Sequence, residues 1–450
     1  MNKKHSVTLD VDKCKGCTTC LHNCPTKAIR VRNGKAVILQ EKCIDCGECI
    51  RVCPHQAKSA LTDKISSIDQ YKMKIAIVPP TMMGQLDSSM SVDQILSEIK
   101  NVGFDDIYEA AYGAEIVGKA IQYELQTHTD QLLISSACPT IVRLIQEKFP
   151  LLVTNIVSLK APIYVTAEKI RRDMISQGYR NEDVGIFFIT PCASKATEIF
   201  NEQNPKLKIN GAISINDIIW EIKRQKSDQT KHAQSVKSFQ GLNWAISGGE
   251  TAFLDKKQTL HVNGIPNVIK VLEEIERGRF PDVKYLELLA CIEGCVGGCL
   301  TVENPFVAKK RISLKVEEIK QENLEGVISQ QQVENIYCEG LLTREPILSK
   351  ECKPIHEDRS EALKKIIAIE DYCDRLPGFD CGSCGAPGCR ALAEDIVTGQ
   401  ASEMDCIFML KDAITKLSKD MLNVSQKVIP IMSVEKNTKN DGNNNDNNKV

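Results

Sequence analysis

The sequence predicts an α/β protein in which parallel sheets flanked by helices lie between two small cysteine-rich segments. Three features predict this fold class: short apolar runs alternate with longer amphipathic stretches from about residue 72, eight cysteines fall before residue 64, and four more fall between 376 and 412. Alternation of this kind is typical of parallel sheets whose faces are covered by helices.

The domain boundaries are placed where the composition changes. We predict a cysteine-rich domain at 1–63, an α/β domain at 64–345, a linker at 346–375, a small cysteine-rich domain at 376–412, an amphipathic helix at 413–436 and a disordered asparagine-rich tail at 437–450. The tail NTKNDGNNNDNNKV is polar and of low complexity, so no packed structure is expected there.

The 20 cysteines are the unusual feature of this composition. The first residues, MNKKHSVTLD, lack the apolar stretch of a signal peptide. We therefore expect a cytoplasmic chain whose thiols bind metal instead of forming disulfides. No run of about 18 apolar residues predicts a membrane span. The net charge of -2 gives no electrostatic reason to expect nucleic acid.

The first eight cysteines form an internal repeat with a period of 29 residues. Each half has the spacing C-x2-C-x2-C-x3-C followed by proline, and the segment 8–62 resembles bacterial two-cluster ferredoxins, which move electrons one at a time. In that arrangement the fourth cysteine of each run ligates the other cluster. The pattern predicts two 4Fe-4S clusters, held by Cys14, Cys17, Cys20 and Cys53 and by Cys43, Cys46, Cys49 and Cys24. A pair of zinc sites is the alternative, which this crossed pattern disfavours.

Five apolar runs are the strand candidates of the α/β domain. They are KIAIVPP at 74–80, QLLIS at 131–135, VGIFFIT at 184–190, NWAIS at 243–247 and YLELLA at 285–290. Helix-like segments such as VDQILSEIKNVG and IVRLIQEKF lie between them. SGGE at 247–250 is typical of a turn, and no G-x-G-x-x-G or P-loop follows a strand.

Three of these runs lead directly into cysteine. Ligands of parallel α/β sheets bind beyond the C-terminal ends of the strands. We therefore expect four thiols to converge there and to hold a further 4Fe-4S cluster: Cys138, Cys192, Cys291 and Cys295. Any one of them alone fits a small buried hydrophobe equally well, but their recurrence favours a shared site.

SSACP, TPCASKATE and ELLACIEGCVGGC resemble, in order and spacing, the three cysteine motifs of the FeFe hydrogenase active-site domain, over roughly residues 72–340. The resemblance implies an H-cluster, in which a 4Fe-4S cluster is joined through one cysteine sulfur to a diiron unit with CO, cyanide and a bridging dithiolate amine. By motif position the four cysteines would hold the cluster and Cys295 would make the bridge. Lys195 matches the lysine that hydrogen-bonds a cyanide ligand, an interaction strengthened by charge.

Several positions depart from the catalytic members of that family. Ala137 stands where they carry a relay cysteine, and a methyl group cannot pass a proton. Catalytic members place acidic groups in the helix before the first motif, and here that helix, EIVGKAIQYE, offers Val117, Gly118, Lys119 and Ala120 in its middle. At the relay serine we align Val157, with Ser158 beside it. Thr190 and Leu289 replace methionines, and Glu198 is retained.

Losing one positioned proton-transfer group costs about a hundred- to ten-thousand-fold in rate. The departures therefore match the sensory branch of the FeFe hydrogenases, whose members lack the relay cysteine. Cys299 replaces a glycine after Cys295. We hypothesise that Cys299 lies near the diiron unit and supplies another thiol or proton route; a packed thiol is the alternative.

The last cysteine group has the spacing C-x2-C-x4-C-x16-C and consists of Cys381, Cys384, Cys389 and Cys406. It resembles a small 4Fe-4S domain of corrinoid iron-sulfur proteins and of sensory hydrogenase-like chains, with zinc as the alternative. Cys338, Cys352 and Cys373, like Cys299, receive no metal assignment.

Apolar residues beyond this group recur at alternating steps of four and three: Leu410, Ile414, Leu417, Met421, Val424 and Val428. The spacing predicts a helix that joins a second copy or another partner, or one that docks on its own domain. Pro430 limits this helix.

Together these features predict a hydrogen-responsive FeFe hydrogenase of low turnover, suited to an anaerobic cytoplasm. It would act on H2 and protons and exchange electrons with a ferredoxin or a signalling protein, and it would need hydrogenase maturation proteins. A fully active ferredoxin-linked hydrogenase and a NARF-like scaffold without the diiron unit are the alternatives.

Overall fold

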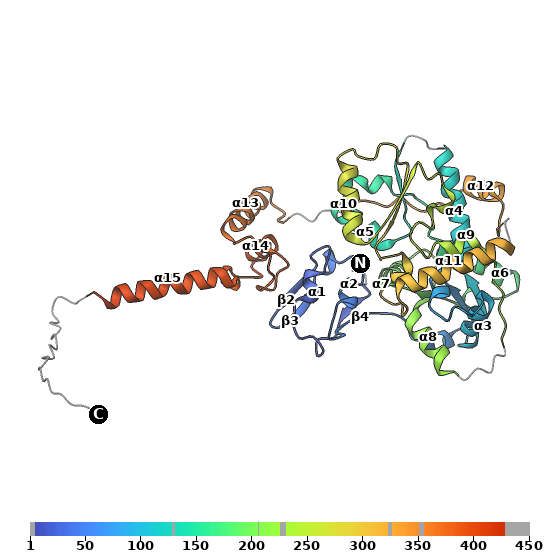
Figure 1. Cartoon of the computed structure of the whole chain (residues 1–450), viewed down its shortest axis with the longest axis horizontal. Coiled ribbons are helices and arrows are strands. Elements are labelled where there is room, and N and C mark those ends of the chain that lie inside the picture. The colour runs from blue at the N-terminus through green and yellow to red at the C-terminus, as the bar shows by residue number, and fades with distance from the viewer. Residues whose placement is uncertain are drawn as a thin grey trace, which may run out of the picture. The chain divides into compact units, whose positions relative to one another are not determined.

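The structure is a computed structural model that describes residues 5–127, 131–205, 207–225, 231–322, 326–350 and 355–427. It divides into two compact units, residues 1–357 with 385–387, and residues 358–384 with 388–450 (Figure 1). Each unit is described by itself. No helix in the described ranges is long and apolar enough to cross a bilayer.

The N-terminal segment is built from two related halves. Strand β1 (Val7–Leu9) pairs antiparallel with β4 (Lys58–Ala60), and β2 (Ile29–Arg32) pairs antiparallel with β3 (Lys35–Ile38). The short helices α1 (Thr19–His22) and α2 (Glu48–Arg51) each carry the third cysteine of a run. The repeat in the sequence is thus a repeat of a loop and a short helix.

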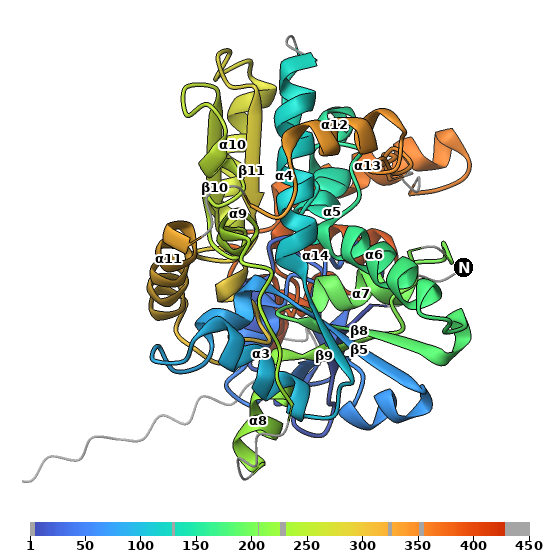
Figure 2. The ribbon, with the colours of Figure 1, turned by 90° about the vertical axis from the view of Figure 1, so that its right-hand side faces the viewer.

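A four-stranded parallel sheet forms the first layer of the larger domain, in the order β6, β5, β8, β9. Its strands are β5 (Met73–Val78), β6 (Asp106–Glu109), β8 (Val184–Thr190) and β9 (Gly211–Ser214). The helices packed around it are α3 (Val92–Asn101), α6 (Pro162–Ser176), α7 (Ala193–Asn201) and α8 (Ile215–Arg224) (Figure 2).

Successive residues of the central strand β8 enter two different hydrophobic cores. Phe187 and Ile189 belong to the core that includes α3 and α8, whereas Ile186 and Phe188 belong to the core that includes α6. Because side chains alternate between the two faces of a strand, a strand covered on both sides is apolar throughout. This explains the unbroken run VGIFFIT.

A second parallel sheet has the order β10, β11, β7. Its strands are β7 (Leu133–Ile134), β10 (Thr259–Asn263) and β11 (Tyr285–Leu289). The helices of this part are α4 (Ala110–Thr127), α5 (Pro139–Lys148), α9 (Phe239–Asn243), α10 (Ile265–Glu276), α11 (Pro305–Glu322) and α12 (Gln330–Cys338). The α/β architecture with parallel sheets and flanking helices is the predicted fold class.

Within the α/β domain, one predicted strand is wrong, and three strands were missed. NWAIS at 243–247 begins at the last residue of α9 and continues as turns, with Trp244 N–H donating to the Gly241 carbonyl and Ile246 N–H to the Asn243 carbonyl. These local bonds use backbone groups that a strand would pair with a neighbour. The strands β6, β9 and β10 were missed because each is short, and because β6 and β10 include polar residues.

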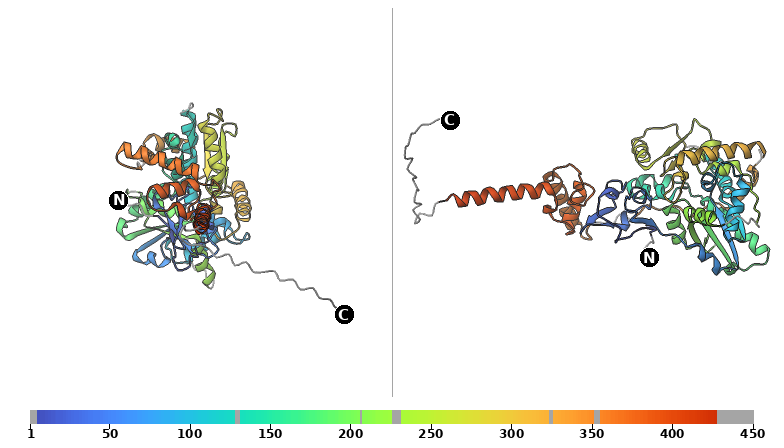
Figure 3. Two further views of the ribbon diagram at one scale, coloured as in Figure 1. Left: turned by 90° about the vertical axis from the view of Figure 1, so that its left-hand side faces the viewer. Right: turned by 60° about the horizontal axis from the view of Figure 1, so that its bottom comes forward.

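The C-terminal unit contains α13 (Arg359–Arg375), α14 (Cys389–Val397) and α15 (Ile407–Ser425). Helix α13 occupies most of the range for which a linker was predicted, and it packs against α14. Figure 3 shows α15 as a single straight helix. Val428, Pro430 and the asparagine-rich tail lie outside the described residues.

Candidate metal centres and the central cavity

Two small pockets in the N-terminal segment bring together the crossed cysteine sets. Cys14, Cys17, Cys20 and Cys53 line the first pocket, and Cys24, Cys43, Cys46 and Cys49 line the second. Backbone N–H groups point at the sulfurs: Ala28 donates to Cys24 Sγ and Ala57 to Cys53 Sγ, each over 3.2 Å. Donors of this kind favour thiolates over thiols, so the donor set and its surroundings fit two 4Fe-4S clusters.

A larger cavity of about 110 Å³ lies where strands of both parallel sheets end. Cys138 follows β7 and begins α5, Cys192 follows β8 and begins α7, and Cys291 and Cys295 follow β11. All four line the cavity. Cys46 lines both this cavity and the second N-terminal pocket, so that pocket directly adjoins the cavity.

The thiols of this cavity are partly buried. Burial raises the pKa of Cys291 to about 12 and the pKa of Cys192 well above its usual value. Buried thiolates persist when they bind a cation, and metal binding then releases their protons. Four thiols that face one space on three separate loops fit a 4Fe-4S cluster.

Lys195 lines the same cavity from the first turns of α7. Its Nζ lies 2.7 Å from Glu198 Oε2 on the same helix, and both side chains are largely buried. The carboxylate of Glu198 fixes the lysine and balances its charge. The cavity extends from the cysteines past Lys195 to an apolar wall that includes Pro79, Phe188 and Leu289. This space and Lys195, the one lysine or arginine among the described residues that line it, fit a diiron unit with anionic ligands.

The positions that depart from the catalytic pattern lie in or near this cavity. Ala137 lines it and contributes a methyl group. On α4, a Cβ added to Gly118 would lie 3.5 Å from the indole of Trp244, which also lines the cavity. A side chain at Gly118 would therefore pack directly against the indole. Thr190 closes the turn before Cys192, because its Oγ1 accepts from the Cys192 N–H over 3.3 Å.

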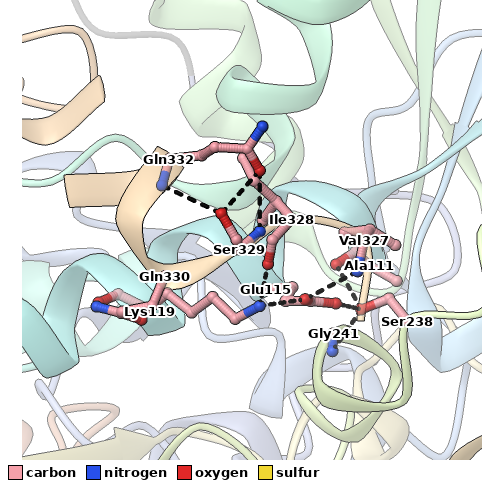
Figure 4. A network of polar contacts seen from close by, with 10 residues as sticks. All are labelled: Ala111, Glu115, Lys119, Ser238, Gly241, Val327, Ile328, Ser329, Gln330 and Gln332. Atoms are coloured by element: carbon pink, nitrogen blue, oxygen red, sulfur yellow. Dashed lines mark hydrogen bonds and ion pairs between the residues drawn. The ribbon is translucent and has the colours of Figure 1, made fainter. Parts of the chain in front are cut away.

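The buried carboxylate of α4 serves a different purpose. Glu115 accepts from Lys119 Nζ over 2.8 Å, from Ser238 Oγ over 2.6 Å and from the Val327 N–H over 3.0 Å (Figure 4). Figure 4 shows that these partners come from α4, from the turn that begins α9 and from the segment before α12. Glu115 thus joins three parts of the chain.

Two buried glutamates that the sequence analysis did not single out line the cavity. Glu250 accepts from Ser135 Oγ over 2.8 Å and from the hydroxyl of Tyr285. Ser135 Oγ accepts in turn from the N–H of Ala137 over 3.2 Å. Glu250 is therefore two hydrogen bonds from the residue that replaces the relay cysteine. Burial, followed by the charge of Glu287, raises the pKa of Glu250 to about 8.

Glu287 lies in the middle of β11 and is held differently. Its carboxylate accepts from the Gly248 N–H over 2.8 Å and from both the N–H and the hydroxyl of Thr251, over 2.9 and 3.0 Å. Burial raises the pKa of Glu287, whereas these donors and the exposed His261 oppose the increase. The signal for this site was a glutamate inside the apolar run YLELLA, since unpaired glutamate is rarely buried.

Arg51 connects the ferredoxin-like segment to the central cysteines. Its Nη1 donates to the Gly297 carbonyl over 2.5 Å, and its Nη2 lies 3.9 Å from Cys291 Sγ.

Cys299 does not line the central cavity. It packs against Gly47, where an added Cβ would lie 2.3 Å from Cys299 Sγ. The structure thus places Cys299 beside the second N-terminal pocket, which Gly47 lines, and a role for Cys299 near a diiron unit stays a prediction.

In the C-terminal unit, Cys381, Cys384, Cys389 and Cys406 line one pocket. Hydrogen bonds from Ser383 lower the pKa of Cys381, which is exposed. The structure leaves Cys338 exposed, with its Sγ 3.7 Å from the Tyr123 hydroxyl, and leaves Cys373 half-buried. Cys352 lies outside the described residues.

Comparison with known families agrees with this geometry. The model of the iron-only hydrogenase large subunit, C-terminal domain, matches residues 72–251 and 215–299, together just over half of the chain. The chain belongs to the iron-only hydrogenase family. A 4Fe-4S dicluster domain model matches residues 6–54, and a model for an Fe-S cluster domain matches residues 376–408.

Iron hydrogenase 1 of Clostridium pasteurianum is a curated relative of this chain. The two are 25% identical over 373 residues, which is 66% of this chain and 65% of the relative, just under two thirds of its length. Two variants of FeFe-hydrogenase HydA1 from Chlamydomonas reinhardtii are among the similar solved structures, each with 13% identity and a TM-score of 0.47. Each match covers 63% of this chain and 98% of that chain.

Proposed function

We propose that this iron-only hydrogenase is a cytoplasmic, hydrogen-responsive protein of low turnover. The observation that carries the proposal is one cavity that combines four thiols and Lys195 with a methyl group, Ala137, at the relay position. The thiols and the lysine supply what a metal cofactor needs. The methyl group removes the usual first step of proton transfer.

The chain's own residues would divide the work at this cavity. Cys138, Cys192, Cys291 and Cys295 would hold a 4Fe-4S cluster, and Cys295 would link it to a diiron unit delivered by maturation proteins. When bound, this group supplies the centre at which H2 is split or formed. Lys195 Nζ, fixed by Glu198, would donate to an anionic ligand of the diiron unit. The apolar wall would limit the access of water.

Protons would move through Glu250 in place of a cysteine. Its carboxyl group lines the cavity, and a pKa of about 8 lets it give or take a proton near neutral pH. Glu287 would continue the route toward solvent, since Glu287 also lines the cavity and pairs across the sheet with the exposed His261. This longer route would support turnover at a rate below that of a dedicated relay.

Electrons would move between the central cluster and the N-terminal clusters past Cys46, which lines both spaces. A ferredoxin or a signalling protein would exchange electrons with the outer clusters. In a hydrogen-responsive protein, the oxidation state of these clusters would carry the signal.

Helix α15 would join two copies of the chain. Positions Ile407, Ile414 and Met421 alternate with Leu410, Leu417 and Val424, and all six are exposed. Isoleucine at the first position of a heptad and leucine at the fourth favour a parallel two-stranded coiled coil. A narrow seam of this kind matches a second helix better than the wider face of a helix that docks on a globular core.

The self-association is tested by light scattering of the full-length protein. Leu417→Glu places a charge in the seam and should convert a dimer into a monomer. Leu422→Glu is the matched control, since Leu422 is as exposed (57% against 61%) but lies outside the seam. A monomeric wild-type protein, or a dimer that survives Leu417→Glu, would contradict this assignment.

The functional proposal is tested by infrared spectroscopy of the anaerobically reconstituted protein with the diiron cofactor, under argon and under hydrogen. CO and cyanide bands that shift with hydrogen, together with slow turnover, support a sensor. Rapid turnover would instead favour a fully active ferredoxin-linked hydrogenase that moves protons through Glu250. This is the second candidate function, and the observation that favours it is the carboxyl group of Glu250 in the cavity. Absent bands with fully loaded 4Fe-4S clusters would favour a NARF-like scaffold.

A further inference from the structure

The two halves of the repeat in the ferredoxin-like segment differ at a buried position on β4. Pro25 and Pro54 correspond at the period of 29 residues, as do Ala28 and Ala57, which are both buried. The next pair is Ile29 in β2 and Lys58 in β4. Ile29 is 2% exposed and Lys58 is 4% exposed, so a lysine occupies a position that is apolar in the other half.

The ammonium group of Lys58 has no hydrogen-bond partner among the described residues. Lysine is almost never fully buried unless its charge is paired, because an unpaired ion in a protein interior costs several kcal/mol. The Lys58 backbone pairs with Leu9 of β1, which holds the side chain inside the segment. The chain therefore buries a cation whose counter-charge is not another side chain of the described structure.

The surroundings of Lys58 indicate where that counter-charge lies. Lys58 lines the first cysteine pocket, which is formed by Cys14, Cys17, Cys20 and Cys53. Burial raises the pKa of Cys20 in the first set and that of Cys49 in the second, and the charge of Lys58 opposes both increases. Cys20, Cys49 and Ile29 share one hydrophobic core. Lys58 thus reaches ligands of both cysteine sets from an apolar interior.

We propose that Lys58 is a shared internal counter-ion for the two N-terminal 4Fe-4S clusters and raises the reduction potential of both. A 4Fe-4S cluster with four thiolate ligands carries a net negative charge, which grows by one when it accepts an electron. A nearby cation stabilises the reduced form more than the oxidised form. Each reduction takes one electron from an external donor and changes no bond to Lys58.

Other lysines near the first cluster do not share this position. Lys35 Nζ donates to the backbone carbonyls of Val11 and Cys14, each over 2.8 Å. Lys15 lines the same pocket but is exposed, so water and salt screen its charge. Lys15 therefore offers a matched control that removes the same charge beside the same cluster.

The test is a redox titration of the full-length protein loaded with its 4Fe-4S clusters, followed by electron paramagnetic resonance. Lys58→Ile copies the first half of the repeat, which carries Ile29. We expect its two N-terminal clusters to show a reduced-to-oxidised ratio about tenfold lower at a fixed potential, or ~59 mV for a one-electron couple. The other 4Fe-4S signals should stay in place. Lys58→Arg should retain the wild-type potentials, and Lys15→Met should shift them by much less.

Unchanged potentials in Lys58→Ile would overturn the proposal, as would an equal shift in Lys15→Met. A shift confined to one cluster would overturn the shared role. Where Lys58→Ile fails to load iron, loading in Lys58→Arg supports the need for the charge, and failure in both overturns it. The outcome does not depend on a diiron unit, so failure here and failure of the proposed hydrogen chemistry are distinguishable.

Discussion

The two walls of the central cavity differ in what they retain from the iron-only hydrogenase pattern. On one wall, four cysteines and Lys195 occupy their motif positions and face one space. On the other, Ala137 and the Gly118–Trp244 contact replace the groups that pass protons in catalytic members. In the proposed function, the first wall would bind metal and is retained, and the second would handle protons and is rebuilt; these are the metal-binding wall and the proton-handling wall.

This difference shows which functions depend on sequence motifs. A cluster needs several ligands at fixed geometry, so its cysteines must keep their places at the ends of particular strands. A proton needs only a titratable group within hydrogen-bond reach, and that group can come from any element that borders the cavity. Here Glu250 and Glu287 border the cavity and come from a turn and from β11.

The largest effect is expected for Glu250→Gln. The amide keeps the shape of the side chain but cannot exchange the proton, so hydrogen turnover should fall by about a hundred- to ten-thousand-fold. The infrared bands of the cofactor should remain, because Glu250 is not a metal ligand. Turnover by gas chromatography of the reconstituted protein measures the effect. Turnover equal to that of the wild type would show that protons do not pass through Glu250.

A second substitution tests the metal-binding wall. Lys195→Met removes the cation that lines the cavity, and we expect retention of the diiron unit to fall by about ten- to a hundredfold, since a hydrogen bond to a charged group contributes about 1.5–3 kcal/mol. The CO and cyanide bands per 4Fe-4S cluster measure retention. Lys169→Met is the control, because Lys169 pairs with Asp173 on α6 and does not line the cavity. Full retention of the diiron unit in Lys195→Met would contradict the assigned role of Lys195 in binding it.

The pH dependence sharpens the role of Glu250. Because its pKa is raised to about 8, the carboxyl group is protonated below that pH and ionised above it. Proton reduction needs the acid, so its rate should fall about tenfold per pH unit above about 8. Hydrogen oxidation needs the base and should rise toward the same pH. The two profiles, measured with an artificial electron donor and acceptor, should lose this dependence in Glu250→Gln.

Much of the metal-binding wall could be predicted from the sequence, because cysteine spacing and the ends of apolar runs determine where thiols converge. The crossed N-terminal sets, the four central cysteines and the last four cysteines each line one pocket. The proton-handling wall could not be predicted in the same way. Glu250 ends the sequence SGGE, which is typical of a turn and does not indicate a buried carboxylate. Its contacts with Ser135 and Tyr285 arise only in the folded chain.

The strands show the same limit at the level of the fold. Strands β5, β8 and β11 were predicted because buried parallel strands are continuous apolar runs. NWAIS has a similar composition but folds into turns after α9, since Ser238 begins that short helix and local bonds then use its backbone groups. Local composition therefore predicts a buried strand only where a neighbouring strand is available.

The smallest effect is expected for Ala137→Cys, which restores the missing thiol. Ala137 lines the cavity, so the new sulfur would face the cofactor space. Catalytic members pass the proton from this cysteine to acidic groups on the preceding helix, but here α4 presents Gly118 packed against Trp244. Turnover should therefore rise by less than about tenfold, a fraction of what one positioned group supplies.

The double variant Ala137→Cys with Glu250→Gln decides whether the two residues act in one route. If the thiol passes its proton to Glu250 through Ser135, the double variant should be as slow as Glu250→Gln alone. Recovery of turnover in the double variant would show that the thiol has an independent exit. In that case the proton-handling wall would hold two proton routes, one through Glu250 and one that begins at position 137. Ala137 would then remove only the first group of the second route.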